Sequence, residues 1–329
     1  MVGRAVTAPG GRPHAETLAL KQAGEAARGA TCYVTLEPCS HYARTPPCVN
    51  ALREAGVARV VSAVSDPDPR VAGRGYKILR EAGIEVVTGI LERDSRWHNR
   101  GHITRITRGR PHTLLKLAIS SDGAIGCEGR GQIPITGVEV EQDVHLVRSQ
   151  SDAIMVGVGT VLADNPNLTC RIAGLEDRSP VRVILDTHAR TPLSFDIVTG
   201  ARTTPTWILA SDQADPSKQE TLKSAGARVF TVPMLASGRL CLDTALSVLG
   251  EQGLTSVLIE GGARLAEALV ENDLADLIDF YFSSHHIGSG KIPALNQTPL
   301  EAVTNSRRYL QVDKRMIGPD RLHQYKRVA

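Results

Sequence analysis

Short apolar segments of strand length alternate with amphipathic segments of helix length along nearly the whole chain. In the first third, the expected strands lie at 31–36, 57–64 and 84–88, and the expected helices at 17–28, 48–55 and 74–82. This β-α-β-α order predicts a largely parallel sheet covered by helices, because parallel strands need a crossover connection between them.

A second, longer alternation follows, and residues 98–111 separate the two. The expected strands lie at 113–120, 153–158, 181–186, 206–210, 227–232 and 255–259, and the expected helices at 138–149, 216–225, 243–252 and 263–271. Strand-like pieces at 277–283 and 308–327 predict a mixed sheet. Residues 98–111 are rich in Arg, Gly and His with little apolar periodicity, so we expect an irregular connector. A length of 329 residues is typical of two domains.

Composition narrows the class of protein. Hydrophobic residues make up 42% and charged residues 22%, which excludes a disordered or collagen-like chain. No run reaches the roughly 18 apolar residues of a membrane helix, and the first twenty residues lack a signal-peptide core. A net charge of +3 argues against a nucleic-acid partner. Six scattered cysteines do not form a secreted disulfide framework, so we expect a cytoplasmic protein in which clustered cysteines bind metal.

One constellation in the first half carries hydrolytic chemistry. His14 and Glu16 open a helix, Cys39 follows a strand, and Cys48 begins another helix after two prolines. One imidazole and two thiolates suit Zn²⁺ with an open fourth position, and a helix N-terminus favours the thiolate of Cys48. Glu16 is placed to carry a proton from water to a departing amine. This ordered set is typical of zinc-dependent nucleobase deaminases.

Two other interpretations of these residues stay open. A histidine such as His14, taken alone, is more often a surface or capping residue, and a single Pro-Cys pair is weak evidence for a metal site. His41 is a rival ligand, because it stands two residues from Cys39. The order of the whole set favours zinc held by His14, Cys39 and Cys48.

The second half carries a nucleotide-like pattern. Residues 259–269 (IEGGARLAEAL) predict a strand, a Gly-Gly turn and a helix, whose first N–H groups suit a dinucleotide pyrophosphate. No G-x-G-x-x-G is present, so a Rossmann domain is not predicted. A Gly-Gly pair after a strand is also often only a turn.

Several charged residues in this half are candidates for binding a phosphorylated substrate. Arg148 and Arg171 have guanidinium groups that suit a phosphate, although the residues alone favour Arg148 as a solvated cation at a helix end, stabilised by the helix dipole. Lys116 lies on a strand that ends in a Ser-Ser-Asp-Gly turn. Asp164 precedes Asn165-Pro166 and is also explained as a turn residue.

These strings together resemble a known family. Eight residues, rather than two, separate the paired cysteines in CSHYARTPPC, and the strings PGGRPHAE, TLEPCSHYARTPPC, DPDPRVAGRG, LLKLAISSDG, DAIMVGVGTVLADNPNLTCR, VRVILDT and IEGG occur in order. The chain resembles the riboflavin-biosynthesis bifunctional deaminase–reductase family over its whole length. The resemblance implies an α/β protein with a cytidine-deaminase-like domain at 1–108 and a dihydrofolate-reductase-like domain at 111–329.

The resemblance also implies the reactions. The family deaminates 2,5-diamino-6-ribosylamino-4(3H)-pyrimidinone 5′-phosphate with zinc and then reduces the ribosyl group to ribityl with NADPH. It implies a small phosphorylated pyrimidine as the partner, no nucleic acid, no membrane and a homo-oligomer.

The resemblance implies a role for each candidate residue. In the first domain, the resemblance implies that zinc is bound by His14, Cys39 and Cys48 and that Glu16 transfers protons. It implies that the pyrimidine is contacted by His41 and Arg44. In the second, the substrate site comprises Lys116, Arg148, Asp164, Leu168, Arg171 and Glu260, with Lys116 and Asp164 as catalytic candidates. The residues implied to contact NADPH are Ala118, Thr160, Asp164, Thr187, Gly262, Ala263 and Arg264.

One departure from the family concerns the start of the chain. Members of the family carry several dozen residues before the His-Ala-Glu motif, including a first helix and strand, whereas thirteen stand here. Losing them from a core costs several kcal/mol at roughly 25 cal/mol per Å². We therefore expect either a misassigned start, the simpler explanation, or a first domain that is inactive and serves as a zinc-stapled structural or oligomerisation module beside an active reductase. RNA base editing is a third hypothesis, disfavoured by the weak net charge.

Overall fold

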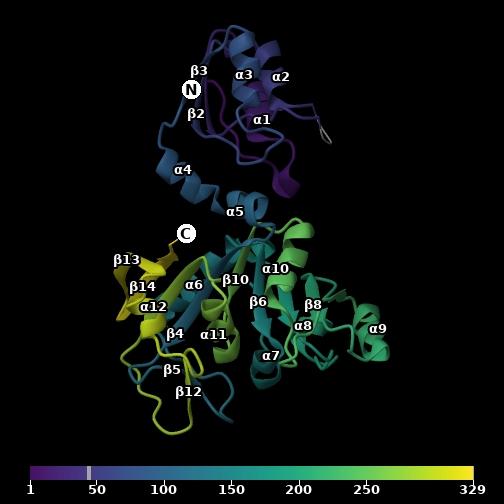
Figure 1. Ribbon diagram of the computed structural model, residues 1–329, viewed down its shortest axis with the longest axis vertical. Helices are drawn as coiled ribbons and strands as arrows, with labels where there is room; N and C mark the ends of the chain where they lie inside the picture. Colours follow the sequence, from purple (N-terminus) through teal and green to yellow (C-terminus); the bar gives the residue numbers. More distant parts are fainter. Residues whose placement is uncertain (43–45, 329) are drawn as a thin grey trace. The chain divides into compact units, whose positions relative to one another are not determined.

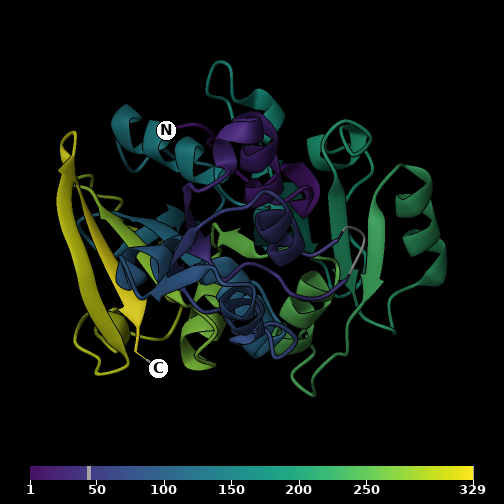
Figure 2. The same cartoon turned by 90° about the horizontal axis from the view of Figure 1, so that it is seen from above.

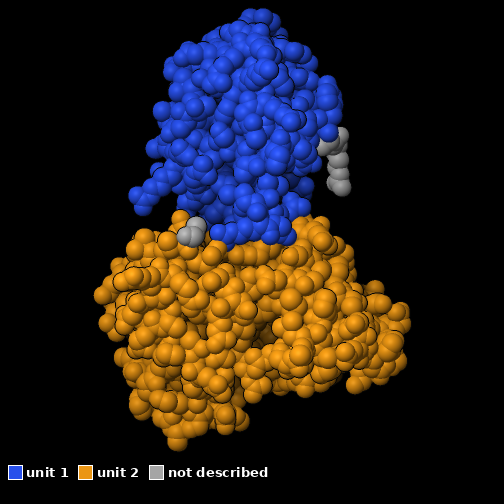
Figure 3. Space-filling model, viewed as in Figure 1, with its two compact units in different colours: residues 1–109 blue, residues 110–329 orange. Residues whose placement is uncertain are grey.

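The computed structural model of the chain describes residues 1–42 and 46–328. These residues form two compact units, Met1–Gly109 and Arg110–Ala329, drawn in different colours in Figure 3. In the described ranges, no helix combines the length and the apolar character needed to cross a membrane.

The first unit is a small parallel sheet with helices packed on it (Figure 1). The strand order is β1-β2-β3, with β1 at Thr31–Leu36, β2 at Arg59–Val64 and β3 at Glu85–Thr88. The helices are α1 (Ala15–Ala23), α2 (Cys48–Glu54) and α3 (Arg74–Glu81), with 3-10 turns η1 (Pro9–Gly11) and η2 (Gly24–Ala27). The buried core comprises Val49, Leu52, Val57, Val60, Leu79 and Ile84. The alternation expected from the sequence is therefore confirmed here.

The expectation of an irregular connector at 98–111 is wrong. The segment contains the end of helix α4 (Glu92–His98) and the whole of helix α5 (Arg100–Arg108). Polar contacts stabilise both helices: in α4, Arg96 Nε donates to Glu92 Oε1 at 2.8 Å one turn away, and in α5, His102 Nε2 lies 3.2 Å from Asp66 Oδ1. Ser95 Oγ donates to the carbonyl of Thr35 at the end of β1. A search for apolar periodicity misses a helix that packs through hydrogen bonds.

The second unit is built on a nine-stranded mixed sheet (Figures 1 and 2). Its order is β13-β14-β11-β4-β10-β6-β7-β8-β9, so β13 and β9 form the two edges seen in Figure 2. The strands are β4 (His112–Ile119), β6 (Ala153–Gly157), β7 (Val181–Leu185), β8 (Thr206–Ala210), β9 (Arg228–Thr231), β10 (Ser256–Ile259), β11 (Leu277–Phe282), β13 (Tyr309–Ile317) and β14 (Asp320–Arg327). The strands from β11 to β9 run parallel, and β14 and β13 complete the sheet as antiparallel strands.

Helices and a small second sheet complete this unit. The helices are α6 (Val138–Ser149), α7 (Val158–Asp164), α8 (Asp196–Thr199), α9 (Pro216–Ser224), α10 (Leu242–Glu251), α11 (Ala263–Glu271) and α12 (Glu301–Thr304), with a 3-10 turn η3 (Glu176–Arg178). Strands β5 (Ala124–Cys127) and β12 (Lys291–Pro293) pair antiparallel. The sequence did not predict α7, because Gly157 just before it and Gly159 within it are typical of a turn, nor did it predict these two short strands.

The central strands of this sheet are buried on both faces. Leu115, Met155 and Ile259 belong to one apolar cluster, whereas Ile154 and Leu258 belong to the other. Alternate residues of one strand therefore enter different cores, which explains the continuous apolar runs in the sequence. The two cores fix the carboxyl ends of β4, β10, β6 and β7 side by side, where ligands bind in open α/β sheets.

Candidate functional sites

Three donors for a metal ion converge in the first unit. His14 stands at the N-terminal end of α1, Cys39 follows β1, and Cys48 is the first residue of α2. Their ligand atoms all lie within 4.8 Å of one another. His14 Nδ1 lies 3.3 Å from Cys48 Sγ and 3.6 Å from Cys39 Sγ. Donors around a tetrahedral Zn²⁺ stand about 3.5–3.8 Å apart, so these residues fit zinc.

The surroundings of Cys39 favour the metal-binding thiolate. Its hydrogen bond with the Cys48 side chain, supported by His14, lowers the pKa of the Cys39 thiol to about 4. The backbone N–H of Cys48 also donates to Cys39 Sγ at 3.2 Å. The same pairing raises the pKa of the Cys48 thiol. One proton is therefore held by the pair and is displaced when a metal binds both sulfurs.

Glu16 is placed beside this cluster without belonging to it. It lies in the first turn of α1, two residues after His14. Burial raises the pKa of its carboxyl, and the carboxyl lies within hydrogen-bonding reach of the Cys48 side chain. A carboxyl whose pKa moves towards neutrality is suited to take up and release a proton.

The two residues expected to face the pyrimidine differ in what the structure describes. His41 follows Cys39 by two positions and is half-buried, and its buried Nδ1 has no hydrogen-bond partner within residues 1–42 and 46–328. The metal cluster found in that part of the chain does not include His41. Arg44 lies outside the described residues.

In the second unit, Lys116, Arg148 and Glu260 form one charged cluster. Arg148 Nε and Nη2 each donate to a different oxygen of Glu260 at 2.7 Å, and Arg148 Nη1 donates to the carbonyl of Thr169 at 3.0 Å. Burial opposes ionisation of Glu260, but Arg148 and then Lys116 lower its pKa overall. Burial lowers the pKa of Lys116, and the charge of Glu260 partly offsets this. Arg148 is thus already paired with a carboxylate.

The structure also brings Thr160 and Gly262 together. The backbone N–H of Gly262 donates to Thr160 Oγ1 at 3.3 Å, and a Cβ on Gly262 would lie 3.4 Å from that oxygen. Gly261 has a φ of +89°, which favours glycine. Helix α11 begins at Ala263, and the first N–H groups of a helix have no carbonyl partner one turn earlier within it. The small residues and the helix start fit a dinucleotide phosphate.

The remaining candidates flank this edge of the sheet. Ala118 lies on β4, Thr187 follows β7, and Arg264 lies in the first turn of α11. Asp164 ends α7, and burial raises the pKa of its carboxyl. Leu168 is buried with a φ of +54°.

Arg171 makes contacts that do not involve the Arg148–Glu260 pair. Arg171 Nη2 donates to Glu141 Oε1 at 3.0 Å, and half of its side chain is exposed. Its backbone N–H donates to His145 Nδ1 at 3.2 Å. These residues line an open groove of about 760 Å³ along α6. Arg171 can therefore bind an anion when its contact with Glu141 is broken.

Sequence reasoning missed Asp279, which lies on β11 opposite Lys116 in register. Only 4% of Asp279 is exposed, and burial raises the pKa of its carboxyl to about 6. Gln324 Nε2 donates to its Oδ1 at 2.8 Å. Two residues on, Tyr281 donates to Asp143 at 2.7 Å, and Lys116 Nζ lies 5.6 Å from the Tyr281 ring centre. The sequence feature that could have identified Asp279 is the presence of one acidic residue inside the apolar run LIDFYF.

Two family models match the chain. The model described as the cytidine and deoxycytidylate deaminase zinc-binding region matches residues 2–64. The model described as the RibD C-terminal domain matches residues 111–316. The cluster of His14, Cys39 and Cys48 lies in the first of these ranges, and the Gly-Gly turn lies in the second.

Two curated proteins that are similar to this chain have the same name. The riboflavin biosynthesis protein RibD of Bacillus amyloliquefaciens is 41% identical over 285 residues, covering 87% of this chain and 76% of its own length. The protein of the same name from Escherichia coli K12 is 37% identical over 331 residues, covering 97% and 88%.

Solved structures agree with these relatives. RibD of Acinetobacter baumannii superposes with a TM-score of 0.86 at 34% identity, covering 100% of this chain and 89% of its own. The deaminase/reductase of Thermotoga maritima gives a TM-score of 0.80 at 30% identity, covering 97% and 86%. The riboflavin biosynthesis reductase of Saccharomyces cerevisiae shares only the fold, with a TM-score of 0.54 at 19% identity. The expected cytidine-deaminase-like and dihydrofolate-reductase-like fold classes are confirmed.

Proposed function

Because the chain belongs to the RibD family of riboflavin-biosynthesis proteins, we propose which residues of each unit carry the two reactions of that family. The chain is a bifunctional enzyme, a zinc-dependent pyrimidine deaminase followed by an NADPH-dependent reductase. The match to the deaminase zinc-binding region supports this over a reductase with an inactive first domain. We assign the deaminase to 1–108 and the reductase to 111–329.

The deaminase substrate is 2,5-diamino-6-ribosylamino-4(3H)-pyrimidinone 5′-phosphate. His14, Cys39 and Cys48 hold zinc, and zinc supplies the Lewis acidity that makes water a nucleophile near neutral pH. Glu16 takes a proton from the water that attacks the ring carbon bearing the amino group, and returns it to the departing ammonia. His41 and Arg44 hold the pyrimidine. The convergence of His14 Nδ1 with the two sulfurs is the observation that carries this assignment.

The reductase acts on the deaminated product. NADPH supplies a hydride for C1′ of the ribosylamine, which is opened to its imine. Lys116 and Asp164 supply or hold a proton near the sugar, and Arg148, Leu168, Arg171 and Glu260 bind the substrate. NADPH contacts Ala118, Thr160, Asp164, Thr187, Gly262, Ala263 and Arg264. The close contact of Thr160 with Gly262 supports this placement of the cofactor.

A coupled assay of Glu16→Ala tests the division of labour. The wild type should release ammonia from the diaminopyrimidine substrate and then oxidise NADPH. Glu16→Ala should keep its zinc, release no ammonia, and oxidise NADPH only when it is given the deaminated substrate. Ammonia release by this variant at the wild-type rate contradicts the role of Glu16, and NADPH oxidation before deamination contradicts the order of the reactions.

We further propose that the enzyme is a cytoplasmic homo-oligomer. All six cysteines are unpaired, which suits a reducing compartment. The edge strand β13 exposes Leu310, Val312 and Met316, and an apolar edge of this kind is suited to pairing with a second copy. Light scattering during size-exclusion chromatography tests this: Leu310→Lys should lower the measured mass, and a monomeric wild type contradicts it.

A further inference from the structure

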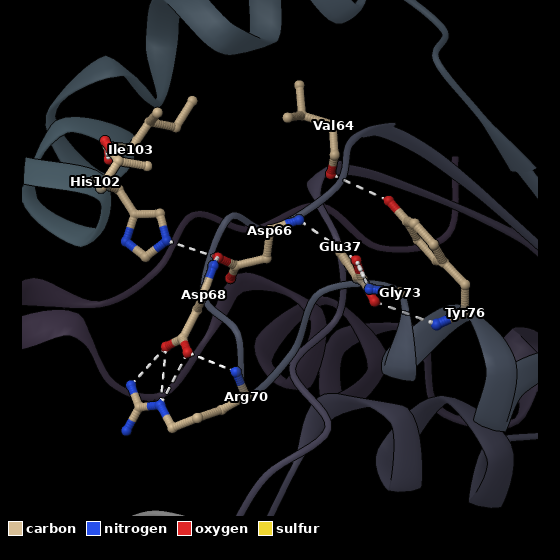
Figure 4. Close-up of polar contacts among 10 residues, drawn as sticks. Glu37, Val64, Asp66, Asp68, Arg70, Gly73, Tyr76, His102 and Ile103 are labelled. Carbon is tan, nitrogen blue, oxygen red and sulfur yellow. Dashed lines mark hydrogen bonds and ion pairs between the residues drawn. The ribbon is translucent and has the colours of Figure 1, made fainter.

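Glu37 is a buried carboxylate that collects backbone N–H donors from one segment of the first unit (Figure 4). It follows β1, is 3% exposed, and stands two residues before Cys39. Oε1 accepts from Gly75 N at 3.0 Å and from Tyr76 N at 3.4 Å. Oε2 accepts from Gly73 N at 2.9 Å and from Asp66 N at 3.4 Å. One side chain therefore fastens both ends of the segment 66–76.

Backbone N–H groups at the start of α3 stabilise the negative charge of this carboxylate. Gly73, Gly75 and Tyr76 lie at or next to the first turn of α3, where backbone N–H groups have no partner inside the helix. A carboxylate at this position satisfies those donors and meets the positive end of the helix dipole. The arrangement allows a charge to stay buried without a basic side chain as its main partner.

Two glycines make the close approach possible. A Cβ on Gly75 would lie 2.4 Å from the carbonyl oxygen of Pro38 and 3.1 Å from Glu37 Oε1. Gly73 has a φ of +81°, which favours glycine. The segment thus packs its backbone directly on Glu37 and Pro38, which lead into the zinc ligand Cys39.

The fastened segment borders the residues expected to face the pyrimidine. Ser40 Oγ donates to the carbonyl of Arg70 at 3.5 Å. Arg70 N and Arg70 Nε donate to Asp68 Oδ1 at 2.9 and 3.0 Å, which closes the turn. Asp66 accepts from the backbone N–H of Asp68 at 2.9 Å, so fixing Asp66 also fixes Asp68. The position of this acidic turn therefore depends on Glu37.

His102 of α5 holds the same turn from its other side. Its Nε2 lies 3.2 Å from Asp66 Oδ1, as Figure 4 shows. Asp66 is thus tied through its N–H to Glu37 and through its carboxylate to His102. A turn held at two points has little freedom to move relative to the zinc ligands.

We propose that Glu37 is a positioning residue of the deaminase, which holds the segment 66–76 beside the zinc-ligand segment so that the turn Asp66–Arg70 meets the pyrimidine substrate in a fixed place. Glu37 itself touches neither substrate nor metal. This inference rests on the proposed deaminase function, and it adds a group that acts on substrate binding through the backbone.

The variant Glu37→Gln tests the inference. An amide keeps the shape but has one acceptor oxygen, so its NH₂ group faces one pair of N–H donors and leaves them unpaired. We expect amide hydrogen exchange in 66–76 to become about tenfold faster, with little change elsewhere in the unit. We expect the KM for ammonia release to rise about tenfold, kcat to change less, and zinc content to stay at the wild-type level.

Two further variants separate positioning from stability. Tyr76→Phe is the matched control, because it removes buried hydrogen bonds to Ser62 and to the carbonyl of Val64 while leaving the donors to Glu37 intact. It should lower the melting temperature of the unit without raising the KM. Gly75→Ala pushes the segment away from Pro38 and should raise the KM as Glu37→Gln does, which keeps the test open if Glu37→Gln fails to fold.

Three results would overturn the inference. Wild-type kinetic constants per bound zinc in Glu37→Gln or Gly75→Ala would mean that the contact only stabilises the fold. Faster exchange without a change in KM would mean that the segment does not meet the substrate. Loss of zinc from Glu37→Gln would mean that the carboxylate holds the metal ligand instead. Absence of ammonia release from the wild type would contradict the deaminase function itself, and the exchange experiment distinguishes that case.

Discussion

Arg148 and Glu260 face each other in a bidentate ion pair, with both N–O distances at 2.7 Å, although they stand 112 positions apart in sequence. Their side chains are only 11% and 12% exposed. Each charge is therefore stabilised mainly by the other, and the charge of Lys116 further stabilises the carboxylate of Glu260. The pair also ties α6, which carries Arg148, to the turn after β10 that leads to the proposed cofactor contacts.

Breaking this pair should destabilise the second unit. Arg148→Met leaves the buried carboxylate of Glu260 without its partner, and such a loss costs about 3–5 kcal/mol. The double variant Arg148→Met/Glu260→Gln should cost clearly less than the sum of the two single variants. Urea unfolding of the four proteins measures the coupling, and strictly additive free energies of unfolding contradict a mutually dependent pair.

Removal of a zinc ligand should affect only the first reaction. The wild type should hold about one zinc per chain, and Cys39→Ala should release it, since two protein donors remain. Ammonia release should disappear while NADPH oxidation with the deaminated substrate continues. Cys241→Ala, a cysteine of the second unit, is the matched control and should retain zinc. Metal analysis showing equal zinc in Cys39→Ala and the wild type would remove Cys39 from the site.

Lys116 should be needed for reduction but not for folding. Lys116→Met keeps the length of the side chain, and because burial disfavours its charge, the variant should be at least as stable as the wild type. We expect NADPH oxidation to slow by about a hundredfold or more if Lys116 transfers the proton. Lys326→Met, an exposed lysine on β14, should leave the rate unchanged. Equal rates in the two variants would exclude Lys116 from the chemistry.

The parts of this structure that were predictable from sequence are those encoded locally. The strand at 31–36 and the helices at 138–149 and 263–271 coincide with the observed elements, because their period and their bounding residues lie within one segment. The cluster of His14, Cys39 and Cys48 was recognisable because each of these residues stands at or within three residues of the end of a helix or strand. Their convergence then follows from the order of elements in a parallel sheet.

The unpredicted features depend on contacts between distant segments. Nothing near Arg148 in sequence indicates that Glu260 will neutralise it, since the pairing exists only once β10 and α6 are packed. Likewise, Glu37 reads as one acid before a Pro-Cys, and its four donors come from residues at least 29 positions away. Polar contacts of this kind have no periodicity, which also explains why α5 was missed.

Asp279 should make the second unit less stable as the pH rises through 6. Burial raises the pKa of Asp279 from 3.8 to about 6, so the folded state holds the proton more tightly than the unfolded chain. The resulting stabilisation is complete below about pH 4 and is lost as the pH rises towards 6. The difference between the two pKa values corresponds to roughly 3 kcal/mol.

Asp279→Asn should remove this cost, because the amide is neutral at every pH and its oxygen can still accept from Gln324. The variant should exceed the wild type in free energy of unfolding by an amount that grows between pH 4 and 6 and is constant above. Asp276→Asn is the matched control of opposite sign: burial opposes its ionisation, but Arg110 lowers the pKa of Asp276 overall, so this variant should lose stability at neutral pH. Urea unfolding at pH 4.5, 6 and 8 measures both, and a pH-independent difference between Asp279→Asn and the wild type contradicts the elevated pKa.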